Sequence, residues 1–370
     1  MDRKDRPAPL PGSSRAMNPQ IPDVRIPLLG AALGDALGAG VEGGHALARA
    51  IEEDRDGVGR RFFPHSPFGF QPGELTDDTQ MAWAAFVELR RGLPDVMVKN
   101  GQHQYVERVG GAYRAWYQSE PPDVGAATAG ALSFDSIDGG WKSWAGGESA
   151  GNGSLMRATA PYVAGYRGEA LLVAAALDSS ITHPDPRCVA SCVWYSATLE
   201  AAQEAEDPSR LMEAIKDGLK ALHKADVLRW LAPLAEESPD SWAAFRSRWA
   251  DAKAEVNRAI EKALAGHYID CLQTPWEQWP TGFVMSTLPQ STWAALQGKR
   301  ADEALRLAVV HGGRDADTIG AIAGGLIGAR FGQEALSHWD ARMLKELRLG
   351  HHWLYSGKEG ALFELLGSSE

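Results

Sequence analysis

Two short acidic stretches contain the residue types that bind hard metal ions. One is GELTDDTQMAW at residues 73–83, and the other is HGGRDADTIG at residues 311–320. Each combines two aspartates with a threonine at the expected start of a helix, namely Thr76, Asp77 and Asp78 in the first and Asp315, Asp317 and Thr318 in the second. Helix capping explains one such side chain, with a gain of about 1 kcal/mol. It does not explain two carboxylates and a hydroxyl at each helix.

If the two stretches meet in space, their four carboxylates repel one another. Two like charges about 4 Å apart cost roughly 4 kcal/mol at an effective dielectric constant of 20. Either some carboxyl groups are protonated, or a divalent cation neutralises them. Oxygen ligands without histidine or thiolate favour Mg²⁺ first and Mn²⁺ second, and two ions would balance four carboxylates. Spacing alone does not establish this meeting, because most of the chain lies between Asp78 and Asp315.

A third stretch, GNGSLMRATAP at residues 151–161, could bind an anion. Gly151 and Gly153 permit backbone conformations that direct successive N–H groups toward one ligand, and Arg157 could add positive charge. No GKS or GKT follows, so the stretch is not a P-loop. An ordinary loop that enters a helix remains an equally good interpretation.

Helices must position these groups. Over residues 26–41, apolar side chains recur every four residues, and Gly30, Gly34 and Gly38 form a second, smooth face. Each glycine costs a helix about 1 kcal/mol relative to alanine. Three glycines in register therefore predict the close approach of another backbone. Residues 76–91 are apolar on nearly every side, which predicts a buried helix.

The whole body is predicted to be all-α. More than ten helical segments follow one another, and strands joined by two-residue hairpin turns are absent. Residues 120–157 are rich in glycine and carry few regular signals. We expect one domain over residues 23–370 and a disordered or loosely attached tail over residues 1–22, which are rich in proline, serine and charge.

Composition limits the classes of function. The 370 residues are 44 % hydrophobic and 23 % charged, with a net charge of -11. This balance is typical of a soluble globular protein and disfavours a broad nucleic-acid or membrane-binding face. The three cysteines, Cys188, Cys192 and Cys271, include no CxxC pair, and no secretory signal is visible, so we expect reduced thiols and a cytoplasmic location. We also expect a monomer.

Five motifs occur in an order that resembles the ADP-ribosylglycohydrolase family. They are GAALGDALGAGVEG (30–43), LTDDTQM (75–81), GNGSLMR (151–157), THPDP (182–186) and GRDADTIGAIAGGLIGARFG (313–332). The resemblance covers residues 26–332. It implies an all-α orthogonal multi-helix bundle with a binuclear Mg²⁺ or Mn²⁺ centre at the floor of a cleft. The implied chemistry is hydrolysis of the bond between C1″ of ADP-ribose and a modified side chain.

The resemblance also implies roles for single residues. Two Mg²⁺ or Mn²⁺ ions would be bound by Thr76, Asp77, Asp78, Asp315, Asp317 and Thr318. Glu42 would lie near the distal ribose as a ligand, gate or acid/base, and it follows Asp35 by seven residues, on nearly the same helical face. Either Glu42 or Asp78 would protonate the leaving group. The substrate would be bound by Gly151, Asn152, Gly153, Ser154, Leu155, Arg157 and His183.

Three points stay open at the level of sequence. Arginine is the preferred modified side chain, but serine, O-acetyl-ADP-ribose, poly(ADP-ribose) and nucleic-acid adducts remain alternatives. An immunity-type protein that occludes an ADP-ribosyltransferase, with residues 1–22 as the blocking arm, is a second class of function. Arg314, which follows two glycines, departs from the family pattern and could contact a substrate phosphate or a neighbouring carboxylate.

Overall fold

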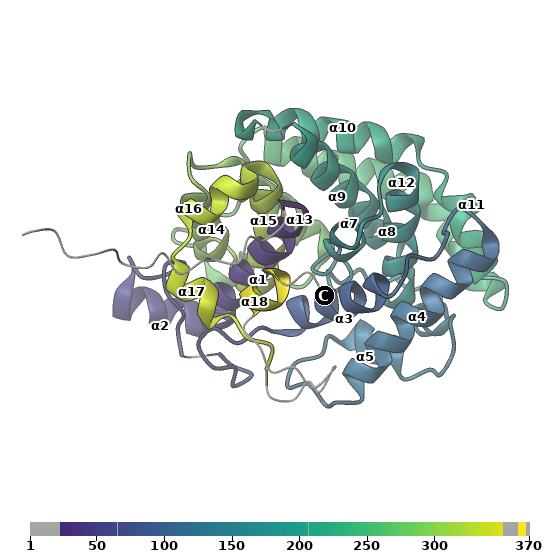
Figure 1. The fold of residues 1–370 in the computed structure, drawn as a ribbon, viewed down its shortest axis with the longest axis horizontal. Coiled ribbons are helices and arrows are strands. Elements are labelled where there is room, and N and C mark those ends of the chain that lie inside the picture. Colours follow the sequence, from purple (N-terminus) through teal and green to yellow (C-terminus); the bar gives the residue numbers. More distant parts are fainter. Residues whose placement is uncertain (1–22, 65, 206, 351–361, 368–370) are drawn as a thin grey trace, which may run out of the picture.

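The computed structural model describes residues 23–64, 66–205, 207–350 and 362–367. Within these ranges the chain is built from helices that run in several directions around a shared centre (Figure 1), with two isolated β-bridges and no β-strand. The all-α prediction is confirmed. The predicted tail, residues 1–22, lies outside the described ranges, so the proposed domain boundary stays a prediction.

The helices follow one another along the chain, with long connections over residues 55–76 and 265–283. The α-helices are α1 (Ile26–Ala39), α2 (Gly44–Asp54), α3 (Asp77–Arg90), α4 (Lys99–Tyr117), α5 (Ala126–Leu132), α6 (Gly139–Trp144), α7 (Ala160–Ala164), α8 (Gly168–Thr182), α9 (Pro186–Glu204), α10 (Leu211–Lys224), α11 (Val227–Leu231), α12 (Pro239–Leu264), α13 (Val284–Leu296), α14 (Ala301–Val310), α15 (Ala316–Phe331), α16 (Ala335–His338), α17 (Ala341–Glu346) and α18 (Leu362–Gly367). The 3₁₀ helices are η1 (Asp23–Arg25), η2 (Pro208–Arg210), η3 (Ala232–Leu234), η4 (Trp276–Gln278) and η5 (Gly332–Glu334).

Helices α1 and α15 pack with their backbones in direct contact near the centre of the molecule (Figure 1). A Cβ atom on Gly34 would lie 2.0 Å from the carbonyl oxygen of Gly320. A Cβ atom on Gly38 would lie 2.3 Å from the backbone nitrogen of Asp317. The predicted close approach is confirmed. Because the two helices are antiparallel, the end of α1 lies against the start of α15.

Asp35 in α1 fixes the start of α3. Its carboxylate is fully buried and accepts hydrogen bonds from the backbone N–H groups of Thr76 and Thr79, each at 3.2 Å. These N–H groups belong to the first turn of α3, where no carbonyl of the same helix can accept them. Burial raises the pKa of Asp35 to about 6, and the hydrogen bonds oppose that rise. Helix α1 therefore positions the starts of both α3 and α15.

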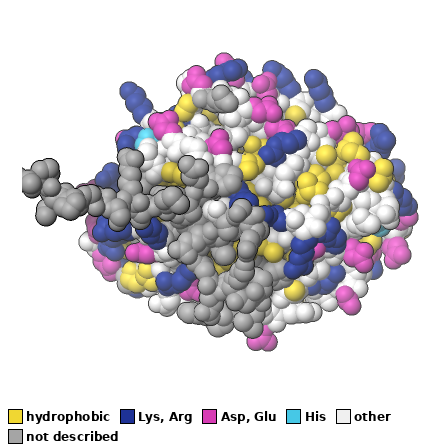
Figure 2. Space-filling view, viewed as in Figure 1, with side chains coloured by type: hydrophobic (Ala, Val, Ile, Leu, Met, Phe, Trp, Pro, Cys, Tyr) yellow, Lys and Arg dark blue, Asp and Glu magenta, His cyan; other side chains and the backbone are white. Residues whose placement is uncertain are grey.

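The surface carries charges of both signs. On the face drawn in Figure 2, basic and acidic side chains are interspersed among uncharged and hydrophobic ones. The described part of the chain contains no helix that is both long and apolar enough to span a membrane. Neither observation conflicts with a composition that is 44 % hydrophobic and 23 % charged.

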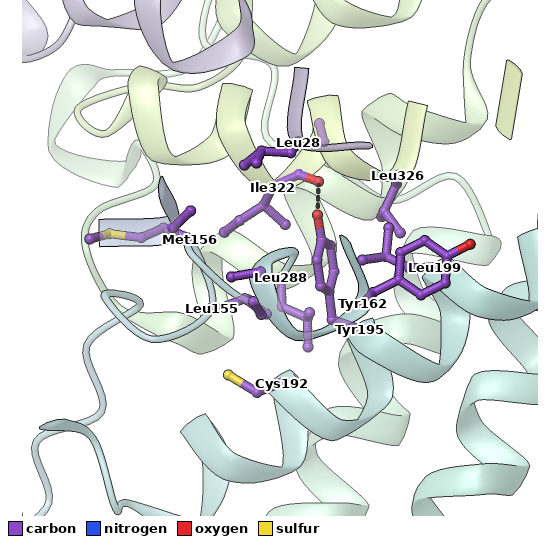
Figure 3. Close-up of a cluster of buried hydrophobic side chains, with 14 of the residues drawn as sticks. Leu28, Leu155, Met156, Tyr162, Cys192, Tyr195, Leu199, Leu288, Ile322 and Leu326 are labelled. Carbon is purple, nitrogen blue, oxygen red and sulfur yellow. Dashed lines mark hydrogen bonds between the residues drawn. The ribbon is translucent and has the colours of Figure 1, made fainter. Parts of the chain in front are cut away.

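An apolar core lies directly behind the glycine-rich stretch 151–161. Leu155 is fully buried and lies in a cluster with side chains of α1, α9, α13 and α15 (Figure 3). The hydroxyl group of Tyr195 in α9 donates a hydrogen bond to the backbone carbonyl of Ile322 in α15, at 2.9 Å. The core thus packs the glycine-rich stretch against α1 and α15.

The structure differs from the sequence prediction over residues 120–157. This region contains α5 and α6, which the sequence analysis did not predict. Helix α5 has the sequence AATAGAL, and α6 begins with two glycines. Small residues do not create a contrast between apolar and polar faces, so the periodic signal of a helix is missing there.

Candidate active site

The two acidic stretches meet at the bottom of one cavity. Thr318 in α15 donates a hydrogen bond from Oγ1 to Oδ2 of Asp78 in α3, at 3.3 Å. Thr76 donates to the same oxygen atom at 3.2 Å. The cavity has a volume of about 330 Å³, and the carboxylate residues in its lining are Glu42, Asp77, Asp123, Asp315 and Asp317. The structure therefore brings together the two groups that spacing could not place relative to each other.

Helix capping does not use the carboxylates of this site. The N-cap of α3 is Thr76, whose hydroxyl oxygen accepts from the backbone N–H of Asp78. Asp315 occupies the N-cap position of α15 but makes no capping hydrogen bond with its side chain. Its Oδ2 accepts instead from Nδ2 of Asn152, at 2.5 Å. The carboxylates are thus free for another role.

Glu42 reaches the site from a loop and not from a helix. Helix α1 ends at Ala39, so the expected shared helical face with Asp35 does not extend to Glu42. The next residue, Gly43, has a φ of 77°, and its N–H group donates to the carbonyl oxygen of Arg314 at 3.0 Å. Carboxylate oxygens of Glu42, Asp315 and Asp317 consequently lie within 4.8 Å of one another.

Three buried carboxylate oxygens of the site lack a hydrogen-bond partner among the described residues. They are Oε2 of Glu42, Oδ1 of Asp78 and Oδ1 of Asp317. A buried carboxylate without a partner is strongly destabilising unless a proton or a cation compensates its charge. The available ligands are carboxylate and hydroxyl oxygens, which suit small divalent cations with hard character. The residues present therefore fit Mg²⁺ or Mn²⁺.

Burial and mutual repulsion raise the pKa values of these carboxyl groups. Burial, followed by the charges of Asp123 and Asp315, raises the pKa of Glu42 to about 9. Burial raises the pKa of Asp315 to about 6. The pKa values of Asp77, Asp78 and Asp317 also lie well above their usual range, mainly because of burial and then of neighbouring carboxylates. Without a cation, part of this site holds protons near neutral pH.

The glycine-rich stretch forms one wall of the cavity through Gly151, Asn152 and Gly153. Neither glycine has a positive φ, so a left-handed backbone is not the reason for glycine here. Their importance lies in the space they leave for His183. A Cβ atom on Gly153 would lie 2.8 Å from Cε1 of that imidazole, and one on Gly151 would lie 3.2 Å from Nε2.

One backbone donor of this wall remains available for a ligand. The N–H group of Asn152 donates to the carbonyl oxygen of Gly282 at 3.0 Å. The N–H group of Gly153, which lines the cavity, has no acceptor among the residues that the structure describes. This part of the wall can therefore donate hydrogen bonds to an anionic ligand.

Three of the expected substrate-binding residues have buried side chains and do not line the cavity. Arg157 is fully buried and donates to Oδ1 of Asp178 at 2.9 Å and to the carbonyl oxygen of Gly153 at 2.8 Å. The Ser154 hydroxyl accepts from that of Ser179, and Leu155 lies in the core. The structure thus gives Arg157 a supporting role behind the wall, in place of the expected contact with substrate.

His183 does line the cavity. Its Nδ1 lies 2.8 Å from Oγ1 of Thr182. Burial, together with the positive charge of Arg157, lowers the pKa of the imidazole to about 3. His183 is therefore neutral at physiological pH.

Sequence reasoning missed Asp123 and the contribution of Asp35. Asp123 lies in a loop within PPDVG, where no helix start or second acid marks it. The sequence prediction uses Asp35 only for its spacing from Glu42, although a single acid inside an otherwise buried helix is itself a signal. Arg314 was singled out, but its guanidinium lies over the ring of Trp276, 4.4 Å from the ring centroid, and donates to that residue's carbonyl oxygen.

Comparisons with known proteins agree with this geometry. The family model of ADP-ribosylglycohydrolase matches residues 23–367. ADP-ribosylarginine hydrolase Tri1 of Pseudomonas putida (strain GB-1) is 28 % identical over 316 residues, which cover 82 % of this chain and 69 % of that protein. A solved structure titled ADP-ribosylglycohydrolase-related protein complex aligns with a TM-score of 0.57 and 25 % identity, covering 93 % of this chain and 95 % of that one. The chain therefore belongs to the ADP-ribosylglycohydrolase family of ADP-ribosyl hydrolases.

Proposed function

We propose that this protein hydrolyses the bond between ADP-ribose and a modified arginine side chain, with two Mg²⁺ or Mn²⁺ ions. The observation that carries the proposal is the set of unpartnered carboxylate oxygens on Glu42 and Asp317, which line one cavity, and on Asp78, which accepts a hydrogen bond from the cavity-lining Thr318. A family of ADP-ribosyl hydrolases makes ADP-ribose the expected ligand of that cavity. The similarity to an ADP-ribosylarginine hydrolase supports arginine over serine as the modified residue.

The metal ligands in this proposal are Thr76, Asp77, Asp78, Asp315, Asp317 and Thr318. Bound ions would supply positive charge beside the distal ribose, where negative oxygen ligands alone would repel the diphosphate. The protein holds these ligands firmly: Thr76 and Thr318 donate to one oxygen of Asp78, and Asn152 donates to Asp315. The Oδ1 atom of Asp78 has no hydrogen-bond partner among the described residues and is then available for a cation.

Glu42 is the better candidate for the general acid. It lines the cavity, and burial together with neighbouring carboxylates raises its pKa to about 9 in the metal-free protein, which favours the protonated form that a general acid needs. Asp78 is almost fully buried and does not contribute to the cavity lining. A protonated carboxyl group next to the breaking bond can donate its proton to the leaving side chain, as in other glycosidic hydrolyses. The remaining carboxylates would stabilise positive charge on the ribose, and a water molecule would form the new bond to C1″ and release its proton to a carboxylate.

The glycine-rich wall would bind the diphosphate and ribose. The free N–H group of Gly153 is a neutral donor, as is the imidazole of His183. Neutral donors can hold phosphate oxygens without neutralising the acidic floor of the cavity. Binding of the diphosphate at this wall keeps the anionic part of the substrate away from the carboxylates at the floor of the cavity.

A direct experiment measures ADP-ribose released from synthetic peptides. The purified protein with Mg²⁺ is expected to release ADP-ribose from an ADP-ribosyl-arginine peptide and much less from an ADP-ribosyl-serine peptide. Chelation of the metal or the Asp315→Ala substitution should abolish release. Full release by Asp315→Ala with added Mg²⁺ would contradict the assignment of the site.

The alternative function, occlusion of an ADP-ribosyltransferase, depends on residues 1–22. These residues lie outside the described part of the chain, so this alternative stays a prediction. Deletion of residues 1–22 tests it, because an occluding arm predicts loss of transferase binding with hydrolysis unchanged. The three free, buried cysteines support a reducing, cytoplasmic location, and we expect a monomer without a nucleic-acid partner.

A further inference from the structure

We propose that Thr182 is a positioning residue that holds His183 in the tautomer with its proton on Nε2. His183 then donates one hydrogen bond from Nε2–H into the cavity. The identity of the acceptor, an oxygen of ADP-ribose, rests on the proposed function. The tautomer itself does not, because it follows from contacts within the protein.

A chain of hydrogen bonds leads from a buried ion pair to the imidazole. Nε of Arg157 donates to Oδ1 of Asp178 at 2.9 Å, and Nη2 donates to Oγ1 of Thr182, also at 2.9 Å. Oγ1 of Thr182 lies 2.8 Å from Nδ1 of His183. The hydroxyl groups of two tyrosines donate to Oδ2 of Asp178, which fixes the far end of the chain; they are Tyr105 and Tyr113.

The direction of the last hydrogen bond follows from the donors available. A guanidinium group only donates, so the Thr182 oxygen must accept from Arg157. Among the described residues, the Thr182 hydroxyl has one other partner, Nδ1 of His183. If Nδ1 carried the ring proton, the hydroxyl proton would lack an acceptor in a side chain that belongs to a residue only 3 % exposed. Nδ1 therefore accepts, and the ring proton resides on Nε2.

Nε2 is directed toward the cavity. No described residue forms a hydrogen bond with this atom, although His183 is only 5 % exposed and lines the cavity. Cβ atoms added to Gly151 and Gly153 would lie 3.2 Å and 3.1 Å from Nε2. The absence of side chains at these two positions thus leaves the opening through which Nε2–H reaches a ligand.

This arrangement gives the cavity a donor of fixed polarity without a positive charge. A free neutral imidazole can exchange its proton between the two nitrogens and present either a donor or an acceptor. Oxygens of a diphosphate accept hydrogen bonds and do not donate them, so an acceptor at Nε2 would repel them. The contact between Thr182 and Nδ1 excludes that state.

The first test is the tautomer of His183 in the ligand-free protein. Protein labelled with ¹⁵N-histidine is examined by NMR, and the His183 signals are identified by their loss in His183→Gln. We expect an unprotonated Nδ1 and a protonated Nε2. A protonated Nδ1 would overturn the proposal, and this outcome requires no substitution at Thr182.

The second test compares Thr182→Val with Thr182→Ser. Valine preserves the shape of threonine but removes the hydroxyl group, whereas serine retains it. We expect Thr182→Val to show a mixture of both tautomers and to weaken binding of ADP-ribose about tenfold, as expected for one hydrogen bond. Thr182→Ser should keep the wild-type tautomer and affinity within about threefold.

Calorimetric titration with ADP-ribose measures these affinities, and the unfolding midpoint shows whether each variant folds. Wild-type affinity and a wild-type tautomer in a folded Thr182→Val variant would overturn the proposal. If the wild-type protein bound no ADP-ribose, the proposed function would fail. The tautomer measured without ligand would still decide the role of Thr182.

Discussion

The starts of α3 and α15 carry the same residue types, yet the protein holds them in place by different means. The start of α3 is fixed by polar contacts, because Thr76 caps the helix and Asp35 accepts from its first N–H groups. The start of α15 is fixed by backbone packing, because Gly34 and Gly38 admit it against α1. Helix α1 thus supports both helix starts, which form the two halves of the acidic site.

This difference shows how the carboxylates remain free. Neither Asp78 nor Asp315 is consumed by capping, since a threonine, a buried aspartate and close packing hold the two helix starts. The consequence is a group of repelling, partly unpartnered acids in the interior. Such a violation of ordinary stability rules is expected at a functional site and is compensated elsewhere.

The largest expected effect is on catalysis. Asp317→Asn should lower the rate of ADP-ribose release about 1,000-fold, because it removes a charged ligand from the site. The same substitution should raise the unfolding midpoint of the metal-free protein at high pH, where the Asp317 carboxyl group must otherwise lose its proton in a buried, repelling environment. The control is Asp217→Asn, which affects only an exposed ion pair with Lys220. A rate within tenfold of wild type would contradict a metal-binding role for Asp317.

The second prediction tests the backbone packing that holds the start of α15 against α1. Gly34→Ala places a Cβ atom 2.0 Å from the carbonyl oxygen of Gly320, so α1 and α15 must separate. We expect a loss of about 3 kcal/mol in the free energy of unfolding, measured with urea, and reduced hydrolysis. Gly111→Ala is the matched control, because a Cβ atom there meets nothing within 4 Å. It should change stability by less than about 1 kcal/mol.

The acidic site also predicts how stability depends on pH. The pKa values of Glu42, about 9, and Asp315, about 6, are raised in the folded state, so the folded protein binds more protons than the unfolded chain. Their stabilising contribution is complete below about pH 4 and is lost as the pH rises through these folded-state values. The unfolding midpoint of the metal-free protein should fall by several degrees between pH 5 and pH 9.

Added Mg²⁺ should flatten this dependence, because a bound cation replaces the protons. Thermal unfolding across the same pH range, with EDTA or with Mg²⁺, makes the comparison. A midpoint that rises with pH in the metal-free protein would show that the site does not hold the protons assigned to it.

The smallest expected effect concerns the hydrogen bonds that hold the start of α3. Asp35→Asn replaces an acceptor oxygen with a donor group beside the N–H groups of Thr76 and Thr79. We expect a loss of about 1–2 kcal/mol in the free energy of unfolding and about tenfold weaker metal binding. The control, Asp207→Asn, changes an exposed carboxylate that accepts a similar backbone hydrogen bond. If both substitutions changed the free energy of unfolding and metal binding equally, Asp35 would have no special role at the start of α3.

The comparison of α3 with α15 also explains which parts of the fold could be predicted. Apolar periodicity predicted α1 and α3, and the glycines in register predicted the backbone contact with α15. Helices α5 and α6 were missed because their small residues give no contrast between faces. The end of α1 was placed too late, so the helical placement of Glu42 was wrong.

The candidate site was predictable only in part. Acids and hydroxyls at two helix starts indicated metal ligands, and order of motifs suggested that they converge. Asp123 gave no comparable signal, because it is a single acid in a loop. The support role of Arg157 depends on Asp178, which packs against it only in the folded chain. Long-range partners of this kind have no local pattern in sequence.

The central claim is that the starts of α3 and α15 form one divalent-cation site. Calorimetric titration of Mn²⁺ into the wild-type protein, Asp78→Asn and Asp317→Asn tests it most directly. One substitution alters only the α3 half, and the other alters only the α15 half. The account predicts that each substitution alone removes most of the affinity shown by the wild-type protein. Wild-type affinity in either folded variant would contradict it.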